Sequence, residues 1–180
     1  TIYDTDDQKR LYKEIMAELD IEPERFPINA LMNRISTAKN ELKVPGNFAK
    51  EANDPVGKVA ARVYEKLQER LKQANAFDFD DLLLYAYLLL KNHPDVLEAY
   101  QLRFRYIMVD EYQDTNHAQY EITRLLAEQH GNIMVVGDDD QSIYSWRGAD
   151  IRNILEFEKD YPQCTTVKLE QNYRSVGNVL

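Results

Sequence analysis

The segment from Tyr106 to Asp114 constrains the fold of this chain more than any other, because an apolar stretch runs directly into acidic residues. Residues 106–109 suit a buried strand, and the acids Asp110, Glu111 and Asp114 follow it. Open α/β sheets place their ligands beyond the carboxyl ends of their strands. Nucleotide hydrolases use paired acids in that position to hold magnesium and to position a water. Taken by themselves, Asp110 and Glu111 fit this chemistry. They fit equally well a solvated acidic loop or a helix N-terminus, where acidic residues are favoured.

The composition predicts an ordered, acidic protein. A length of 180 residues suggests one domain or two small ones, and a hydrophobic content of 44% is enough for a core. The net charge of −9 argues against a simple basic nucleic-acid module. It does not exclude a motor that grips nucleic acid by stacking, and 12 Tyr with 6 Phe are a rich aromatic supply.

The cellular setting is predicted from three absences. The single cysteine, Cys164, cannot form an internal disulfide, which indicates a reducing compartment. The first residues lack the pattern of a signal peptide, and the longest apolar run, residues 82–90, is about half as long as a membrane span. We therefore expect a soluble cytoplasmic protein with no membrane partner. Because the first residue is Thr rather than Met, we also expect a piece of a longer protein.

Helical patterns fill the first half of the chain, with apolar residues recurring at helical spacing. The fourth expected helix is apolar nearly all round, which predicts that it is buried. The expected helices are one with a capping box at Thr5–Gln8, one over residues 31–42 stopped by Pro45-Gly46, one from Asn53-Asp54-Pro55 to about Leu71, and one from Asp78 or Asp80 to about Lys91.

The second half alternates between strand and helix patterns. Such alternation with short loops predicts a parallel sheet with helical crossovers. The boundary between the two halves is expected within residues 91–105. The expected strands cover residues 106–109, 133–136 and 165–169, and the expected helices cover residues 116–129 and 151–159.

The segment 137–149, GDDDQSIYSWRGA, follows the second expected strand. Its three acids, Asp138 to Asp140, suit either a metal site or a polar loop in which Asp140 caps the next turn. Gln141 is uncharged and offers both a donor and an acceptor, which suits it to read a phosphate oxygen or a water. These residues extend the acidic edge predicted at the end of the first strand.

Aromatic and basic side chains in the second half could contact bases and phosphates. Tyr144 and Trp146 lie close together with Arg147 beside them, which suits base stacking plus a phosphate contact, although core packing of the two aromatics is the alternative. Just after the third expected strand, Tyr173 could stack on a base and Arg174 could reach a γ-phosphate. A packed Tyr beside a surface Arg is the simpler explanation of that pair.

A further aromatic residue lies in the acidic segment 78–82, DFDDL. Its acids could be no more than charges at the start of a helix. Phe79 between them could belong to the core or form an exposed stacking platform.

Together these segments resemble the Rep/UvrD-like family of superfamily 1 DNA helicases. Residues 109–116, VDEYQDTN, are similar to the Walker B motif of that family, and residues 136–149 are similar to its third motif. Residues 169–175, LEQNYRS, are similar to its fourth motif, and segment 78–82 resembles a further family element. The resemblance spans nearly the whole chain and is densest from residue 77 onward. A run as long as the third motif is far more specific than a lone glycine-rich pattern.

The resemblance implies a nucleotide site that uses ATP and Mg²⁺. Asp110 is expected to hold Mg²⁺ through its coordination shell, and Glu111 is expected to activate the hydrolytic water and to belong to the metal site as well. Gln141 should sense the γ-phosphate and couple it to the DNA groove. Tyr173 should stack on adenine, and Arg174 should contact the γ-phosphate.

The resemblance also implies a DNA site and named partners. Tyr144 and Trp146 should stack on single-stranded bases, with Phe79 as a further platform and Arg147 linking the DNA side to the nucleotide side. The expected partners are single-stranded DNA, junctions of single- and double-stranded DNA, and the remainder of the helicase chain. The implied activity is ATP-dependent movement in the 3′ to 5′ direction with duplex unwinding, in repair, replication restart or recombination.

The expected fold is α/β, with a helical subdomain followed by an incomplete RecA-like parallel sheet with helical crossovers. Residues 1–91 resemble the helical 1B subdomain of the family. Residues 92–166 are expected to form part of the first RecA-like motor domain, and residues 167–180 the start of the second.

The phosphate loop of such a motor, Gly-x-x-x-x-Gly-Lys-Ser/Thr, is missing from the sequence. The nearest stretch, Pro55 to Val59, lacks the first glycine and the hydroxyl residue and lies in a helical context. We therefore expect an internal slice of a longer helicase. Alone, it should not hydrolyse ATP at a useful rate, because Glu111 has no lysine-held triphosphate to act on. A sheet without the phosphate-loop strand should also expose an open edge.

Three other functions compete with a plain helicase. The chain could be the helicase part of a helicase-nuclease. It could be a metal-dependent nuclease without ATP, built on Asp110, Glu111, Asp114 and the acids 138–140. It could be a non-catalytic module that binds DNA or protein through its helical half. The third motif and Arg174 favour the helicase, in which Asp114 is more a loop or cap residue than a third metal ligand.

Overall fold

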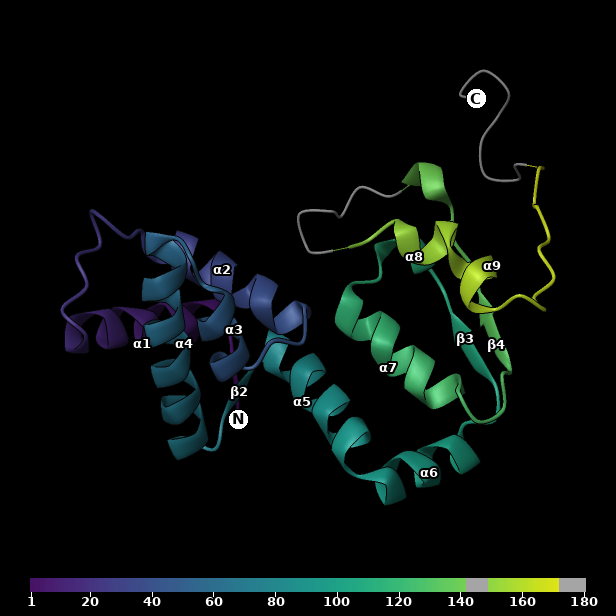
Figure 1. Ribbon diagram of the computed structural model, residues 1–180, viewed down its shortest axis with the longest axis horizontal. Helices are drawn as coiled ribbons and strands as arrows, with labels where there is room; N and C mark the ends of the chain where they lie inside the picture. The colour runs from purple at the N-terminus through teal and green to yellow at the C-terminus, as the bar shows by residue number, and fades with distance from the viewer. Residues whose placement is uncertain (142–148, 172–180) are drawn as a thin grey trace.

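The computed structural model describes residues 1–141 and 149–171, which form a helical part followed by a small α/β part (Figure 1). Within those ranges no helix has the length and apolar character needed to span a membrane. The elements are β1 (Ile2–Tyr3), α1 (Thr5–Glu18), α2 (Ile28–Asn40), α3 (Pro45–Glu51), α4 (Pro55–Gln73), β2 (Phe77–Asp78), α5 (Phe79–Asn92), α6 (Pro94–Arg103), β3 (Ile107–Val109), the 3₁₀ turn η1 (Tyr112–Asp114), α7 (His117–Ala127), β4 (Ile133–Val135), the 3₁₀ turn η2 (Asp139–Gln141), α8 (Arg152–Leu155) and α9 (Phe157–Asp160).

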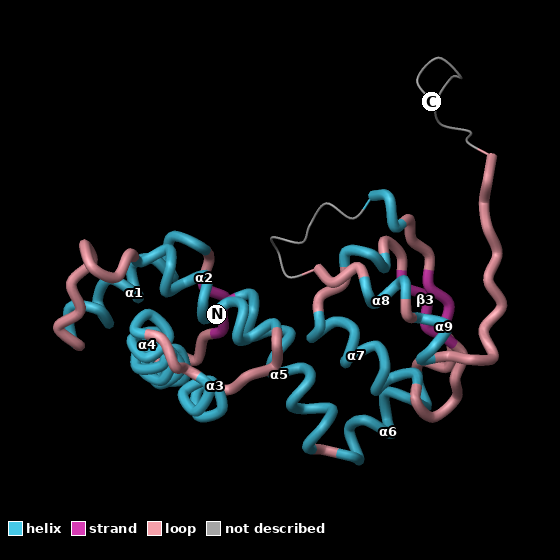
Figure 2. The backbone as a smooth tube through the Cα atoms, turned by 45° about the horizontal axis from the view of Figure 1, so that its top comes forward, coloured by secondary structure: helices cyan, strands magenta, loops and turns pink. Residues whose placement is uncertain are grey.

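Helices α1, α2 and α4 enclose the main apolar core. Its side chains lie at helical spacing, as the sequence predicts, and the largest fully buried ones include Ile15, Leu31, Ile35, Tyr64 and Leu67. The short strand β1 pairs in parallel with β2, which joins the beginning of the chain to the beginning of α5. Figure 2 shows this strand pair among the helices, well apart from the second pair, β3 and β4.

Two of the helix boundaries confirm local signals in the sequence. Asp54 is the N-cap of α4, and its carboxylate accepts a hydrogen bond from the Gly57 amide at 2.9 Å, while Pro55 occupies the first turn. Asp78 is the N-cap of α5 and forms a capping box with Asp81. Both helices begin where an acidic side chain can satisfy amides that have no partner within the helix.

Two other boundaries differ from the prediction. The capping residue of α1 is Asp4, which accepts hydrogen bonds from the Asp6 and Asp7 amides at 2.9 Å, so the capping box expected from Thr5 is wrong. Pro45 does not stop α2. That helix closes itself earlier, where the Lys43 amide donates to the Ala38 carbonyl at 2.8 Å, and Pro45 begins α3, since proline suits a first helical turn.

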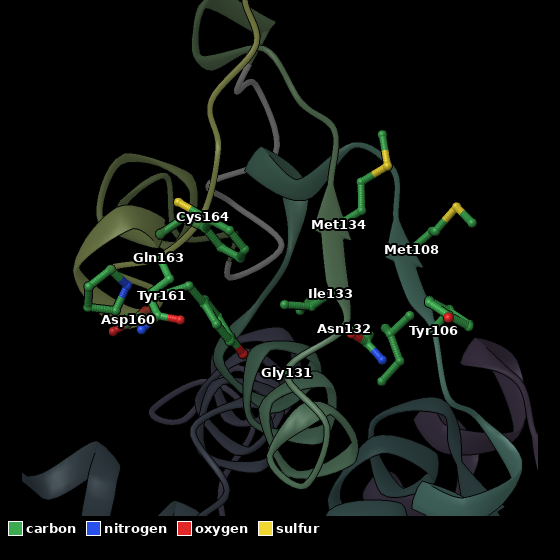
Figure 3. A pocket seen from close by; sticks show the side chains of 13 residues that line it. Tyr106, Met108, Gly131, Asn132, Ile133, Met134, Asp160, Tyr161, Gln163 and Cys164 are labelled. Carbon is green, nitrogen blue, oxygen red and sulfur yellow. The ribbon is translucent and has the colours of Figure 1, made fainter.

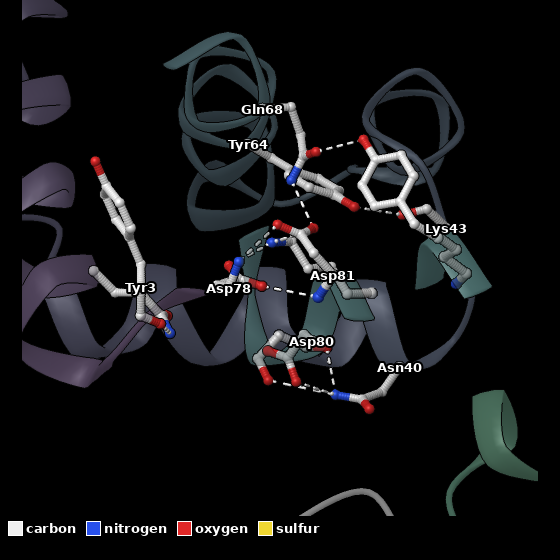
Figure 4. A network of polar contacts seen from close by, with 12 residues as sticks. Tyr3, Asn40, Lys43, Tyr64, Gln68, Asp78, Asp80 and Asp81 are labelled. Atoms are coloured by element: carbon white, nitrogen blue, oxygen red, sulfur yellow. Dashed lines mark hydrogen bonds and ion pairs between the residues drawn. The ribbon is translucent and has the colours of Figure 1, made fainter. Parts of the chain in front are cut away.

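A buried ion cluster fixes the start of α5 (Figure 4). The ammonium of Lys39, on α2, lies 2.5 Å from the Asp78 carboxylate and 2.8 Å from that of Asp81, and its side chain is only 1% exposed. Gln68, on α4, donates to the Asp81 carboxylate at 2.9 Å. Burial raises the pKa of Asp78, and the Lys39 charge opposes that rise. The cluster therefore ties α2 and α4 to the capping box of α5.

The helix α5 is buried on one side and exposed on the other, so the prediction that it is buried holds for one face only. Leu84 and Leu90 are buried where α5 packs against α2, α6 and α7, whereas Phe79 is 58% exposed and Leu89 is also exposed. Apolar residues on all sides of a helix allow other elements to pack against every side of it. They do not supply the covering element, and none of the described residues supplies it here.

The α/β part contains the predicted parallel strand pair. Strands β3 and β4 are in register from Ile107 with Ile133 to Val109 with Val135, and α7 is the crossover between them. The boundary region contains α6, which packs on α5 and α7. The sequence thus predicts correctly a helical part followed by a parallel sheet with a helical crossover.

The chain beyond β4 departs from the prediction in two places. The helix expected over residues 151–159 is divided into α8 and α9 at Glu156, whose φ of −104° and ψ of 4° are not helical. Residues 165–169 form no strand, and Val167 and Leu169 are 74% and 86% exposed. A strand needs a neighbour for its backbone hydrogen bonds, and in the described part of the chain β3 and β4 pair only with each other.

Replacing Lys39 by Met should destabilise this chain by about 3–5 kcal/mol, because it leaves the Asp78 and Asp81 carboxylates buried without their cation. Urea denaturation followed by circular dichroism measures the change. Lys43→Met is the matched control, since Lys43 pairs with Glu41 and Glu51 at the surface, where such pairs contribute about 0–1 kcal/mol. Equal effects of the two substitutions would contradict the role given to the buried cluster.

Candidate functional site

The two acidic turns meet where β3 and β4 end. The pairing continues past the strands, because the Val136 amide donates to the Val109 carbonyl at 2.8 Å and the Tyr112 amide donates to the Val136 carbonyl at 3.0 Å. This continuation brings Asp110 and Glu111, after β3, beside the turn that begins at Asp138, after β4. The carboxyl edge of the sheet therefore carries the predicted polar residues from both strands.

The turn after β3 is held in an unusual conformation. Glu111 has a φ of 49° and a ψ of 45°, in the left-handed region that non-glycine residues rarely adopt. The Asp110 carboxylate accepts from the Glu111 amide at 2.9 Å, and the Asp114 amide donates to the Glu111 carbonyl at 2.9 Å. Asp110 and Glu111 both remain exposed. Such strain is concentrated at functional sites, where the surrounding contacts enforce it.

Gln113 joins the two turns, and the sequence reasoning missed it. Its side chain is 1% exposed. Its Nε2 donates to Glu111 Oε2 at 2.8 Å, and its Oε1 accepts from the Asp138 amide at 3.1 Å. A glutamine inside an acidic motif is the only signal in the sequence. The contact itself depends on a residue 25 positions further along the chain.

The turn after β4 is built around Asp138. Its carboxylate accepts from the Asp140 amide at 3.0 Å and from the Gln141 side-chain Nε2 at 2.6 Å. The Gln141 amide also donates to the Asp138 carbonyl at 3.1 Å. Gln141, the predicted sensor of phosphate, thus lies in the turn next to the Glu111 turn. Both its backbone amide and its side-chain amide donate hydrogen bonds to Asp138.

A small pocket of about 420 Å³ opens beside the first acidic turn. Asp110, Glu111 and Asp114 line it together with Leu83 from α5. The Asp114 Oδ1 is buried and has no hydrogen-bond partner among the described residues. An oxygen left in this way marks a place where a water or a cation would satisfy it.

The carboxylates of Asp110 and Glu111 fit a magnesium ion that is bound together with a substrate. They do not form a metal site made of protein ligands only. Over residues 1–141 and 149–171, no three His, Cys, Asp or Glu side chains come together to hold a metal ion. The metal site of the nuclease alternative, with Asp110, Glu111, Asp114 and Asp138 joined, is therefore not formed in that part of the chain. Magnesium is usually bound through one or two carboxylates, with waters and substrate phosphates completing its shell. Asp110 and Glu111 can supply those carboxylates.

A second, larger hollow lies elsewhere. A cavity of about 750 Å³ runs along the strand pair, and Tyr106, Met108 and Met134 line it together with Phe157 and residues 160–164 (Figure 3). None of the acidic residues 110, 111 and 138 lines it. The larger volume is thus separate from the predicted chemistry, and the functional assignment rests on the acidic turns.

A polar link connects the helical part to the acidic turn. Asn116, the N-cap of α7, donates through its Nδ2 to Asn40 Oδ1 at 2.6 Å. The Nδ2 of Asn40, the last residue of α2, donates to Asp80 Oδ1 at 3.1 Å. Asp80 directly follows Phe79, whose ring is exposed at the start of α5. The predicted DNA platform and the segment after the acidic turn are therefore joined through Asn40.

The remaining predicted site residues lie outside the described part of the chain. They are Tyr144, Trp146 and Arg147 of the third motif and Tyr173 and Arg174 of the fourth. Of the predicted set, the structure brings together Asp110, Glu111 and Gln141, and it places Phe79 on α5.

Comparisons with known proteins agree with the resemblance in the sequence. A family model described as the UvrD/REP helicase N-terminal domain matches residues 1–162. A protein of Staphylococcus epidermidis named ATP-dependent DNA helicase PcrA is 51% identical over all 180 residues, and one of the same name from Staphylococcus aureus is 50% identical over the same length. The chain spans about a quarter of the length of these relatives, 25% in both cases.

The backbone at Gly137 lies so close to Gln113 that an added side chain would force a neighbour to shift. A Cβ there would lie 2.5 Å from Gln113 Oε1 and 2.7 Å from the Ile154 side chain. We expect Gly137→Ala to destabilise the chain by about 1–3 kcal/mol, the usual cost of overpacking, with a lower midpoint of thermal unfolding. Gly46→Ala is the matched control, since no atom lies within 4 Å of its Cβ position. An unchanged midpoint for Gly137→Ala would contradict the close packing of the two turns.

Proposed function

We propose that this chain, which belongs to the UvrD/REP helicase family, is part of the core of a DNA helicase that hydrolyses ATP and contacts DNA. One observation carries the proposal. The ends of two parallel strands bring Glu111 and the Gln141 turn together, joined through Gln113. Neither a nuclease nor a passive binding module requires a γ-phosphate sensor beside a candidate base.

We assign different roles to the exposed carboxylates of Asp110 and Glu111 at the carboxyl edge of the strand pair. Glu111 would orient and deprotonate the attacking water, and Asp110 would hold Mg²⁺ through its hydration shell. Bound Mg²⁺ supplies neutralisation of the charge on the phosphates of ATP. Gln141 exchanges its hydrogen bond with Asp138 for one with the γ-phosphate. Catalysis of this type depends on positioning and charge rather than on covalent chemistry.

Other parts of a complete helicase would finish the nucleotide site. This sequence has no phosphate loop, so the lysine that holds the triphosphate belongs to another segment. Tyr173 would stack on adenine and Arg174 would contact the γ-phosphate from the second motor domain, which we assign to begin at residue 167. Residues 1–91 would form the helical 1B subdomain, and residues 92–166 part of the first motor domain.

The DNA side of the proposal starts from Phe79. Its exposed ring offers a face on which a base can stack, and Tyr144 and Trp146 would extend this platform. Arg147 would connect the platform to the nucleotide side, in parallel with the Asn40 link. The proposed substrate is single-stranded DNA next to a duplex, along which the motor moves from 3′ to 5′.

The nucleotide role is tested in a chimera in which these 180 residues replace the matching segment of the Staphylococcus aureus PcrA. We expect DNA-stimulated phosphate release that Glu111→Gln lowers by roughly 10²- to 10⁴-fold, the usual contribution of a general base. Glu128→Gln, at an exposed position near the end of α7, is the control and should remain within about twofold of the parent. The isolated chain should release no phosphate above background. Retention of a tenth or more of the activity by Glu111→Gln would contradict the assignment.

The DNA role is tested by Phe79→Ala in the same chimera. Loss of one stacking platform should weaken binding of a fluorescent single-stranded oligonucleotide by roughly 5- to 150-fold, as measured by fluorescence anisotropy. Phe104→Ala, which removes a partly exposed ring after α6, is the control. Equal affinities of the two variants would show that Phe79 does not contact DNA.

A further inference from the structure

We propose that Gln113 is a positioning residue for ATP hydrolysis, which holds the Glu111 carboxylate in place and couples it to the turn that carries Gln141. The proposal rests on the function proposed above and adds a residue to it. Gln113 is buried and uses both ends of its amide on the two acidic turns. No apolar partner could make either contact.

The direction of the Gln113 amide is determined by its partners. The Asp138 backbone N–H can only donate, and the ionised Glu111 carboxylate can only accept. The Oε1 of Gln113 must therefore face Asp138, and its Nε2 must face Glu111, as observed. Turning the amide over would oppose donor to donor and acceptor to acceptor, so the side chain has one stable orientation.

This contact uses only one of the two carboxylate oxygens of Glu111. Its Oε2 accepts from Gln113 at 2.8 Å, and no hydrogen bond within the described residues uses its Oε1, which is free to accept the proton of a water. An exposed glutamate without such a tether would sample several rotamers. The hydrogen bond from Gln113 therefore lowers the conformational entropy that Glu111 must lose when it is positioned as the base. A displacement of the base by about 1 Å can lower the rate 10²-fold.

The same amide makes Glu111 sensitive to the second turn. Gln141 Nε2 donates to the Asp138 carboxylate, the Asp138 amide donates to Gln113, and Gln113 donates to Glu111. When Gln141 leaves Asp138 for a phosphate, the turn that presents the Asp138 amide can move. That movement reaches Glu111 through Gln113. Gly137 provides the space for this contact, since a side chain there would collide with Gln113 Oε1.

Two substitutions in the PcrA chimera test the proposal. Gln113→Met removes both hydrogen bonds at similar length without adding charge. Gln113→Glu keeps an acceptor for the Asp138 amide and puts a second carboxylate oxygen against Glu111. For both we expect kcat of DNA-stimulated hydrolysis to fall about 10²-fold while KM for ATP stays within about threefold, because only the base is displaced. Gln129→Glu, the same change at an exposed position, should match the parent.

An exchanged pair gives a second, independent measurement. In Glu111→Gln/Gln113→Glu the donor and the acceptor trade places, so the hydrogen bond returns while the base is lost. We expect its melting temperature to rise above that of Gln113→Glu, with kcat still at the level of Glu111→Gln. This measurement does not require Gln113→Met to fold. Absence of any recovery in melting temperature would overturn the direct contact.

The outcomes separate the positioning role from the function on which it rests. If Glu111→Gln is inactive while Gln113→Met keeps kcat within about threefold of the parent, the positioning role is overturned and the helicase function stands. If kcat stays and only the melting temperature falls, Gln113 is structural and the proposal fails. If the parent chimera has no DNA-stimulated activity, or Glu111→Gln keeps it, the proposed function and this inference fail together.

Discussion

The arrangement of this chain depends on the buried ion pairs that the Lys39 ammonium forms with Asp78 and Asp81. The ammonium holds the Asp78 and Asp81 carboxylates at the start of α5, and these two acids in turn cap that helix. A buried pair gains little stability over apolar packing, and its directional contacts specify one geometry. Here the geometry is that of α5, which packs on α7 and exposes Phe79 at its first turn. The placement of a candidate DNA platform therefore follows from a charge cluster in the helical core.

The same helix start reaches the acidic turn through short polar side chains. Asp80 accepts from Asn40, and Asn40 accepts from Asn116 at the N-terminus of α7. On the other side of that segment, the Thr115 carbonyl accepts from the Asn153 side chain at 3.0 Å. The residues that follow the acidic turn are thus held by α2 and by α8 together. Rotation of the helical part relative to the strand pair would have to break the contact between Asn40 and Asn116.

Signals in the sequence predict those features whose causes are local. Asp54 and Asp78 cap the expected helices because a side chain and the next few amides suffice, and the acids after β3 follow from an apolar strand that ends. Three features that depend on a distant partner are not predicted correctly. Residues 165–169 look like a strand and have no neighbour to pair with among the described residues, and α5 looks buried and has no cover on one face. The amide of Gln113 becomes meaningful only when Asp138 is known to lie beside it.

The candidate site therefore depends more on its hydrogen bonds than on its sheet. A two-stranded sheet is marginally stable at best, and Met108 and Met134 on this one are exposed. Glu111 occupies a left-handed conformation that costs of order 1–3 kcal/mol. The contacts that hold it come from its own turn, through the Asp110 carboxylate and the Gln113 side-chain amide. The Gln113 side chain also accepts from the Asp138 amide, so it both positions the acid and joins the segment after β3 to the segment after β4. The position of the candidate base and the link between the two turns thus depend on the same side-chain amide.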